Sequence, residues 1–243
     1  IYIFIPLLII PQLLFSGVIV KFDKLHPSLS NATEVPVIGN MMLSRWAYEA
    51  LTVEQVAHNK LEDHYFVNKL SLSKSKWKKD FWLPEMQSQV NILLNDKNAS
   101  SKQHDDAIDI LYNGIQKEEE SLTNYSCTSC LDDLKNKSMT TEEELHNINE
   151  FLNMIKQNSI IKINKNNDII QGFIDSIGVD QYKVMQSQYI NESLNDLLSN
   201  RMEKNKIILT DNQIFQNDDP IYNNPTGVSF LSTHYYSPYK YFF

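Results

Sequence analysis

The chain has 243 residues and a formal net charge of −8, with 22 Lys and Arg against 30 Asp and Glu residues. That length suffices for one substantial domain or two small ones. The acidic balance argues against nucleic acid and against a polybasic contact with anionic lipid as binding modes, because both need clustered cations. Only six glycines and eight prolines occur, which favours helices over a turn-rich all-β fold.

The first element, residues 1–20, carries no charged side chain. A run of roughly twenty apolar residues can cross about 30 Å of hydrocarbon as a helix. The run is not a signal peptide, because it lacks a starting Met, a basic leader and a small-residue cleavage site. We therefore expect part of a transmembrane helix from a longer membrane protein. Pro6, Pro11 and Gly17 are candidates for a flexible gate, although such residues are also ordinary in packed membrane helices.

The second segment, 21–66, contains a short apolar stretch from Val35 to Leu43 and then a helical pattern. The apolar stretch is too short to span a bilayer, so we expect it to lie at the membrane surface or to dip back into it. Ser44 is a plausible N-cap, and the helix is expected to continue to about Phe66. Its apolar positions at three- and four-residue spacing are Ala47, Ala50 and Leu51.

Four more helices are predicted from apolar residues that recur on one face. The first three faces are Met86, Val90, Leu93 and Leu94; Ile108, Leu111, Tyr112 and Ile115; and Leu145, Ile148, Phe151, Leu152 and Ile155. The last and longest helix, over 167–202, has two apolar stripes. The first stripe is Ile170, Phe173, Ile174 and Ile177, and the second is Ile190, Leu194, Leu197, Leu198 and Met202. Polar loops are predicted at 96–102, 123–139 and 159–166. Pro84 should kink the second of the five helices or mark its start, and Gly178 is a candidate break.

This pattern predicts an all-α fold in which an up-and-down helical bundle over 67–232 follows the partial transmembrane helix. The chain ends with six aromatic residues in 234–243, beside Lys240. Such a cluster is typical of a membrane–water boundary, so 233–243 is expected to approach a final membrane helix. The alternative is that these aromatic side chains cap the bundle.

The two cysteines, Cys127 and Cys130, form a C-x-x-C pair. Such a pair can be a redox dithiol or half of a zinc site. The redox interpretation needs a βαβ context, and the zinc interpretation needs a second pair or nearby His residues. A local disulfide or two unreactive thiols is the simpler interpretation, and an oxidising compartment would favour the disulfide.

The stretch Ser44-Arg-Trp-Ala-Tyr-Glu-Ala-Leu51, continued by Glu54-Gln55, His58-Asn59-Lys60 and Tyr65-Phe66, resembles permeases of ATP-binding-cassette exporters of the White, or G-subfamily, type. The order of a membrane helix, a short apolar segment and this helix is similar to the long bacterial versions found in Bacteroidetes-like genomes. In that family a large extracytoplasmic insertion separates the last two membrane helices. The segment 219–222 and the aromatic end resemble the re-entry of the chain, and 189–194 resembles part of the insertion.

The resemblance implies a fragment of an exporter in the bacterial inner membrane, with 1–66 in the outer gate and 67–232 as a periplasmic lid or docking domain. It also implies contact with membrane lipid and pairing of half-transporters, such as a homodimer. ATP and Mg would bind in a nucleotide-binding domain elsewhere in the parent chain. The sequence given contains no G-x-x-x-x-G-K-[ST] phosphate loop, so we expect neither enzyme activity nor a cofactor in this fragment.

Four residues of the family-like stretch are candidates for coupling at the membrane interface. Arg45 and Glu49 stand four residues apart and can pair along the helix; the pair is either a clamp that transmits movement of the spans or a simple exposed ion pair. Trp46 and Tyr48 are expected to anchor the helix at the level of the lipid headgroups. The polar side chains of 58–64 could be drawn as a metal site, but solvated side chains explain them better.

The alternative function is a membrane-anchored helical sensor or binding module whose ligand occupies the bundle core. The two functions differ in the sequence that surrounds this chain. An exporter needs a phosphate loop upstream and a further span after Phe243, whereas a sensor needs a cytoplasmic signalling segment.

Overall fold

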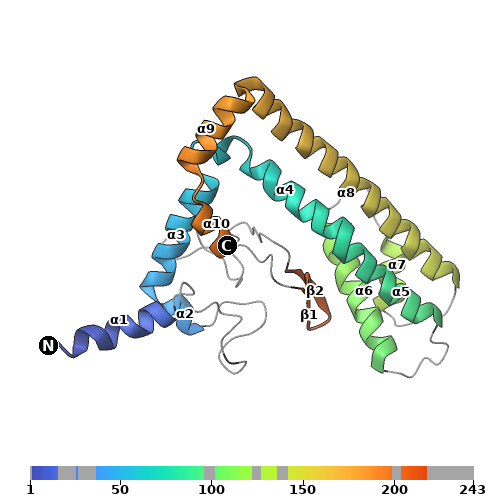
Figure 1. Ribbon diagram of the computed structural model, residues 1–243. Coiled ribbons are helices and arrows are strands. Elements are labelled where there is room, and N and C mark those ends of the chain that lie inside the picture. The colour runs from blue at the N-terminus through green and yellow to red at the C-terminus, as the bar shows by residue number, and fades with distance from the viewer. Residues whose placement is uncertain are drawn as a thin grey trace. The chain divides into compact units, whose positions relative to one another are not determined.

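A computed structural model of the protein describes residues 2–15, 26, 37–95, 102–121, 127–135, 142–198 and 204–217. These residues are mostly helical (Figure 1), which confirms the all-α class at that level. One β-hairpin is the exception. The candidate gate residue Gly17 and the aromatic segment 233–243 lie outside the described residues.

The described chain divides into two compact units. The first takes the chain up to Leu70 and again from Ile169 to Lys204, and the second takes Ser71–Asp168 and Asn205–Asn217. The boundary after Leu70 falls inside α4 (Phe66–Trp77) and the boundary after Asp168 falls inside α8 (Glu142–Ile177), so these two helices belong to both units.

The first unit is built from short helices joined by small apolar clusters. Val53 and Ala57 form one cluster and Val56 and Leu70 another, and Phe66 packs against both. In chain order its elements are α1 (Phe4–Leu14), α2 (Val37–Met41), α3 (Leu43–Ala57), the 3₁₀ turn η2 (Glu62–His64), the start of α4, the end of α8, α9 (Val179–Tyr189) and α10 (Glu192–Leu198).

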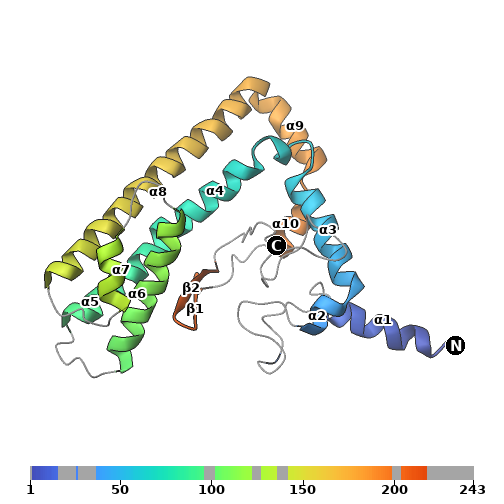
Figure 2. The ribbon, with the colours of Figure 1, turned by 180° about the vertical axis from the view of Figure 1, so that it is seen from behind.

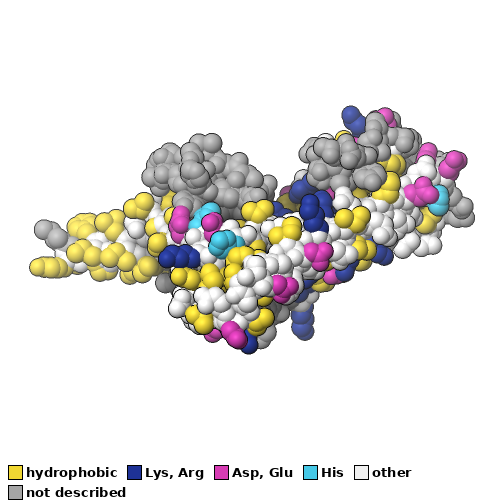
Figure 3. All heavy atoms as spheres, turned by 90° about the horizontal axis from the view of Figure 1, so that it is seen from above, with side chains coloured by type: hydrophobic (Ala, Val, Ile, Leu, Met, Phe, Trp, Pro, Cys, Tyr) yellow, Lys and Arg dark blue, Asp and Glu magenta, His cyan; other side chains and the backbone are white. Residues whose placement is uncertain are grey.

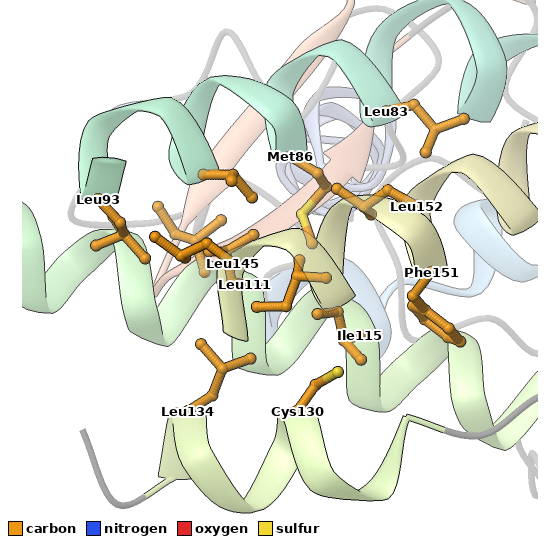
Figure 4. Packing of buried hydrophobic residues seen from close by; sticks show 14 of the residues in the cluster. Leu83, Met86, Leu93, Leu111, Ile115, Cys130, Leu134, Leu145, Phe151 and Leu152 are labelled. Atoms are coloured by element: carbon orange, nitrogen blue, oxygen red, sulfur yellow. The ribbon is translucent and has the colours of Figure 1, made fainter. Parts of the chain in front are cut away.

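The second unit has a continuous apolar core, to which α5, α6, α7 and α8 all contribute (Figure 4). Met86, Leu111, Ile115, Ile148 and Leu152 are completely buried there. Its elements are the end of α4, the π-helical turn η3 (Lys78–Trp82), α5 (Leu83–Asn95), α6 (Lys102–Ser121), α7 (Thr128–Lys135), most of α8, β1 (Ile207–Thr210) and β2 (Gln213–Gln216). The apolar faces predicted around Met86, Ile108 and Leu145 are those that form this core.

Helix α3 is shorter than predicted, since it ends at Ala57 and not near Phe66. Asn59 explains the end. Its side-chain Oδ1 accepts hydrogen bonds from the backbone N–H groups of Leu61 and Glu62, both at 2.9 Å. Such an Asx turn competes with the helical hydrogen bonds. After the 3₁₀ turn η2, the chain forms an α-helix again only at Phe66.

The loop predicted at 159–166 is wrong, because α8 runs through it without a break. The segment is rich in Asn, Ser and Lys but holds no Pro or Gly, and these polar residues only weakly disfavour a helix. Ser159 Oγ donates to the carbonyl of Ile155, and Asn166 Nδ2 donates to that of Lys162. The side chains thus bond back to the helix.

The break predicted at Gly178 is confirmed, since α8 ends at Ile177 and Gly178 has φ +84°.

The helix around Pro84 is interrupted by η3, which lies between α4 and α5 (both labelled in Figure 2). Pro84 is the second residue of α5 and has no N–H to donate. A π-helical turn directly before it is one recognised way for a helix to accommodate such a defect. A kink or a helix start was predicted at Pro84, and α5 starts at Leu83, directly before it.

The hairpin of β1 and β2 was not predicted. The strands pair antiparallel with Ile207 opposite Gln216 and Thr210 opposite Gln213. Asp211 and Asn212 connect them, with φ of 51° and 55°, as the two central positions of a type I′ turn require. Likewise α7 lies within the predicted loop 123–139.

Candidate functional site at the start of helix α3

Arg45 and Glu49 form a buried ion pair on α3. Arg45 Nη2 lies 2.9 Å from Glu49 Oε2, and each side chain is only 5% exposed. Their spacing of four residues puts both on one face of the helix. The exposed ion pair considered from the sequence is therefore not what forms. Burial makes each charge dependent on the other, because an unpaired charge is costly away from water.

Trp46 joins α3 to α2. Its indole Nε1 donates a hydrogen bond of 2.9 Å to the backbone carbonyl of Asn40. The guanidinium carbon of Arg45 lies 4.4 Å from the centre of the same ring, within the range of a cation–π contact. The aromatic ring thus connects the buried ion pair to the neighbouring helix.

Ser44 joins α3 to α1. Its Oγ donates a hydrogen bond of 2.7 Å to the backbone carbonyl of Gln12. The N-cap position of α3 belongs to Met42 and has no side-chain cap, so Ser44 does not cap the helix as expected. It contacts another helix instead.

Tyr48 lies on the same stretch and is partly buried. Burial raises the pKa of its phenol above the ordinary value, and a hydrogen bond with Thr52 opposes that shift. The phenol therefore stays neutral at physiological pH. Its predicted position at the lipid headgroups is not tested by these contacts and stays a prediction.

An exposed apolar surface adjoins this cluster. Figure 3 shows hydrophobic side chains along nearly all of α1. Val37 and Met41 of α2 are each 76% exposed and Leu43 of α3 is 63% exposed. The exposed members on α1 are Phe4, Ile5, Leu7, Leu8, Ile9, Ile10, Leu13 and Leu14, preceded by Tyr2 and Ile3. Contiguous apolar surface of this kind marks a contact with another protein or with a membrane.

Helix α1 covers 11 residues, with Pro6 near its start and Pro11 inside it. Within the part of the chain that the structure describes, no helix combines the length and apolar character needed to cross a bilayer.

No family model, curated protein or solved structure matches the chain.

The remaining candidate residues lie apart from this cluster. Cys127 and Cys130 are joined in a disulfide at the start of α7 in the second unit, where the Cys130 side chain packs in the core. In the described ranges no three His, Cys, Asp or Glu side chains are grouped to hold a metal. Around 58–64, His64 stacks on Phe173 at 4.8 Å and Glu62 pairs with Lys69 at 2.9 Å.

The sequence indicated the four candidate residues and the pairing of Arg45 with Glu49, but not the partners of Ser44 and Trp46 on α1 and α2. Gln12 and Asn40 contribute backbone carbonyls, which any residue could supply, so no sequence signal marks them. The same holds for the contacts that attach α9 to the rest of the first unit. Tyr65 and Tyr182 share a hydrogen bond between hydroxyls 3.2 Å apart, and Gln55 Nε2 donates to the carbonyl of Tyr189 at 2.9 Å. These residues are more than 110 positions apart in sequence.

Proposed function

We propose that the chain is part of the permease of an ATP-driven exporter, in which residues 1–66 belong to the outer gate and 67–232 form an extracytoplasmic domain. The proposal begins with the resemblance of Ser44–Leu51 to exporter permeases of the White type. In this proposal α1 belongs to a longer transmembrane helix over 1–20, and membrane lipid covers its exposed apolar side chains.

One observation carries the proposal: the residues of the family-like stretch are the ones that connect α3 to its neighbours. Ser44 bonds to α1, Trp46 bonds to α2, and Arg45 joins Trp46 to Glu49. A buried ion pair has few alternative arrangements that keep both charges satisfied. Such a cluster is suited to moving α1, α2 and α3 together, as an element that transmits motion of the spans must do.

The proposal also assigns partners and location. ATP and Mg would bind in a nucleotide-binding domain elsewhere in the parent chain, and two copies would pair across the membrane. The polar domain would lie in the periplasm of a bacterium. The disulfide between Cys127 and Cys130 supports that location, because disulfides persist in oxidising compartments. The gate role of Pro6, Pro11 and Gly17 remains part of this proposal.

The first test is the gene itself. We expect the reading frame to encode a phosphate-binding loop upstream and a further apolar span after Phe243. A frame that encodes a complete protein without either segment would overturn the proposal.

The second test changes the coupling cluster in the full-length transporter. We expect Arg45→Ala and Trp46→Ala to impair export while nucleotide binding stays normal. Glu150→Ala is the matched control, because Glu150 faces His146 in another i,i+4 contact, at 3.6 Å, whose side chains are both mostly exposed. Normal export by both cluster variants, at normal protein levels, would contradict the coupling role.

The alternative of a sensor or binding module has one observation in its favour. The second unit carries an open, mostly polar groove of about 420 Å³ lined by Ser88, Asn91, Ile92, Asn95 and Gln103. Its amide groups could bind a polar ligand through hydrogen bonds. A cytoplasmic signalling segment in the reading frame, in place of the phosphate loop, would favour this function.

A further inference from the structure

Three lysines from two separate parts of the chain interact electrostatically in the second unit. Lys74 lies in the last turn of α4, and Lys78 is the first residue of η3. Lys117 lies in α6, about forty positions along the chain. Convergence of like charges is unfavourable by itself, and the chain as a whole is acidic. The arrangement therefore needs a physical reason.

The contacts of Lys78 and Lys117 connect η3, α6 and β2. Lys78 Nζ is 2.5 Å from Glu118 Oε2, which attaches η3 to α6 beside Lys117. Lys117 Nζ lies 5.5 Å from the centre of the Phe215 ring on β2, and β2 packs against α6. Lys74 precedes Lys78 by four residues, one turn along the same side of a helix. Lys78 and Lys117 thus lie at neighbouring contacts of α6, and Lys74 stands one helical turn before Lys78.

The electrostatics of Lys74 agree with that geometry. Partial burial lowers the pKa of its amine, and the positive charges of Lys117 and Lys78 lower it further. Glu118 offsets one positive charge, so the formal charge of the three lysines and Glu118 together is +2. The π-helical form of η3 is a second unusual feature of this place, and π-helical turns occur frequently at functional sites.

We propose that Lys74, Lys78 and Lys117 bind a phosphoryl group as a dianion. A phosphate monoester carries close to two negative charges at neutral pH and offers three acceptor oxygens, which matches the net charge of the site. Lysine is a common phosphate ligand that acts as a point charge. The phosphoryl group can come from free phosphate, from a small phosphate ester or from a lipid headgroup. This proposal does not depend on the exporter assignment.

Calorimetric titration of the full chain in neutral detergent tests the proposal with inorganic phosphate, glycerol 3-phosphate and short-chain phosphatidic acid as probes. We expect saturable binding of at least one probe, weakened about tenfold or more by Lys74→Gln and by Lys117→Gln. Lys156→Gln is the matched control, because Lys156 is an exposed lysine on α8 in the same unit. Stronger binding of the phosphatidic acid identifies a lipid source, and equal binding of the two esters shows that the phosphate alone is recognised.

Two measurements separate a site from general attraction between charges. Binding of the phosphate esters should weaken below about pH 6, where their dianion gains a proton, whereas sulfate binding should not. Lys74→Gln should also raise the thermal midpoint without ligand, because it removes repulsion among the amines. The proposal is overturned if no probe binds saturably, or if Lys156→Gln weakens binding as much as Lys74→Gln and Lys117→Gln.

Discussion

At the scale of single residues, burial decides what the Arg45–Glu49 pair contributes. An exposed i,i+4 ion pair stabilises a helix by only about 0.3–0.5 kcal/mol. Here both side chains are 5% exposed, so removal of one partner leaves a charge in a poorly solvated place. The local structure is therefore expected to depend on the intact pair, and the stability lost when one partner is removed should exceed that of an exposed pair.

We therefore expect Glu49→Ala to lower the free energy of unfolding of the first unit by about 3–5 kcal/mol, the usual cost of breaking a buried pair. The double variant Arg45→Met with Glu49→Leu should recover much of that loss, because it leaves no buried charge. Amide hydrogen exchange within α3, followed at increasing urea concentrations in detergent, measures both. A loss no larger than that of the exposed control Glu150→Ala would contradict the role of burial.

Lys74 gives a prediction about pH. Its pKa in the folded protein is below the unfolded value, so between the two pKa values the unfolded chain binds more protons. Stability contributed by this residue should therefore rise as the pH increases through that interval. The buried phenols Tyr48 and Tyr65 have raised pKa values, so their contribution falls as the pH rises past the ordinary tyrosine value.

The difference between wild type and Lys74→Gln isolates the lysine from the tyrosines. We expect the variant to be more stable near pH 7 and its advantage to shrink as the pH rises toward the ordinary lysine range. Lys78, Lys117 and Glu118 face the same place and are unchanged in both proteins, so they cancel in the comparison. A constant difference across pH, measured by urea unfolding, would contradict the lowered pKa.

At the scale of elements, Gly178 fixes where α8 ends and α9 begins. Its φ of +84° suits glycine and strains other residues, at a cost of about 1–3 kcal/mol. We expect Gly178→Ala to destabilise the chain by about that amount. Gly172 is the matched control, because it lies inside α8 and an added Cβ there meets nothing within 4 Å. Gly172→Ala should stabilise the chain by about 0.5–1 kcal/mol. Chemical unfolding measures both variants. Equal changes in the free energy of unfolding at the two sites would contradict this explanation.

The sequence could predict those elements whose own apolar side chains, by their spacing, determine which face packs in the core. The faces around Ile108 and Leu145 have clear helical spacing and form the core. By contrast, α8 continues through 159–166 because this segment contains no Pro or Gly. Its many Asn, Ser and Lys residues resemble a loop and so hide that the helix continues. The hairpin did have a local signal, the Asp211–Asn212 pair between short apolar runs. Each strand, however, has only four residues, which is too short for a clear alternation of apolar and polar side chains.

The candidate site divides in the same way. Arg45, Trp46, Tyr48 and Glu49 could be selected from the sequence, since they belong to the stretch that carries the family resemblance. That the ion pair is buried could not be predicted, because burial depends on what packs against α3. The three lysines gave no signal at all, since they come from segments about forty positions apart.

At the scale of the whole molecule, the two units differ in how they are held together. Within the described residues, the second unit has a continuous apolar core, whereas the first has two small clusters supplemented by hydrogen bonds, aromatic contacts and ion pairs. Regions with few buried apolar contacts open at lower free energy. We expect amide hydrogen exchange to be slower in α5 and α6 than in α3 and α9. Equal protection in both units would indicate that they open as one.

The exposed surface of α1 leads to the broadest prediction. Eight large apolar side chains of this helix are each more than 40% exposed, and water would make such a surface prone to aggregate. Lipid would remove it from water at a gain of about 25 cal/mol per Å² of apolar area. We expect the purified full chain to float with phosphatidylcholine vesicles in a density gradient. Leu7→Asp with Leu8→Asp should abolish flotation, because charged side chains are costly in hydrocarbon.

The control for this experiment is Ile161→Asp with Ile169→Asp, which places the same charges on exposed apolar positions of α8. That variant should float like the wild type if α1 is the membrane contact. Should both variants float equally well, α1 is not what binds lipid. Should the wild type stay soluble and monomeric without vesicles or detergent, the surface has another partner, and the transmembrane part of the exporter proposal would have to be abandoned.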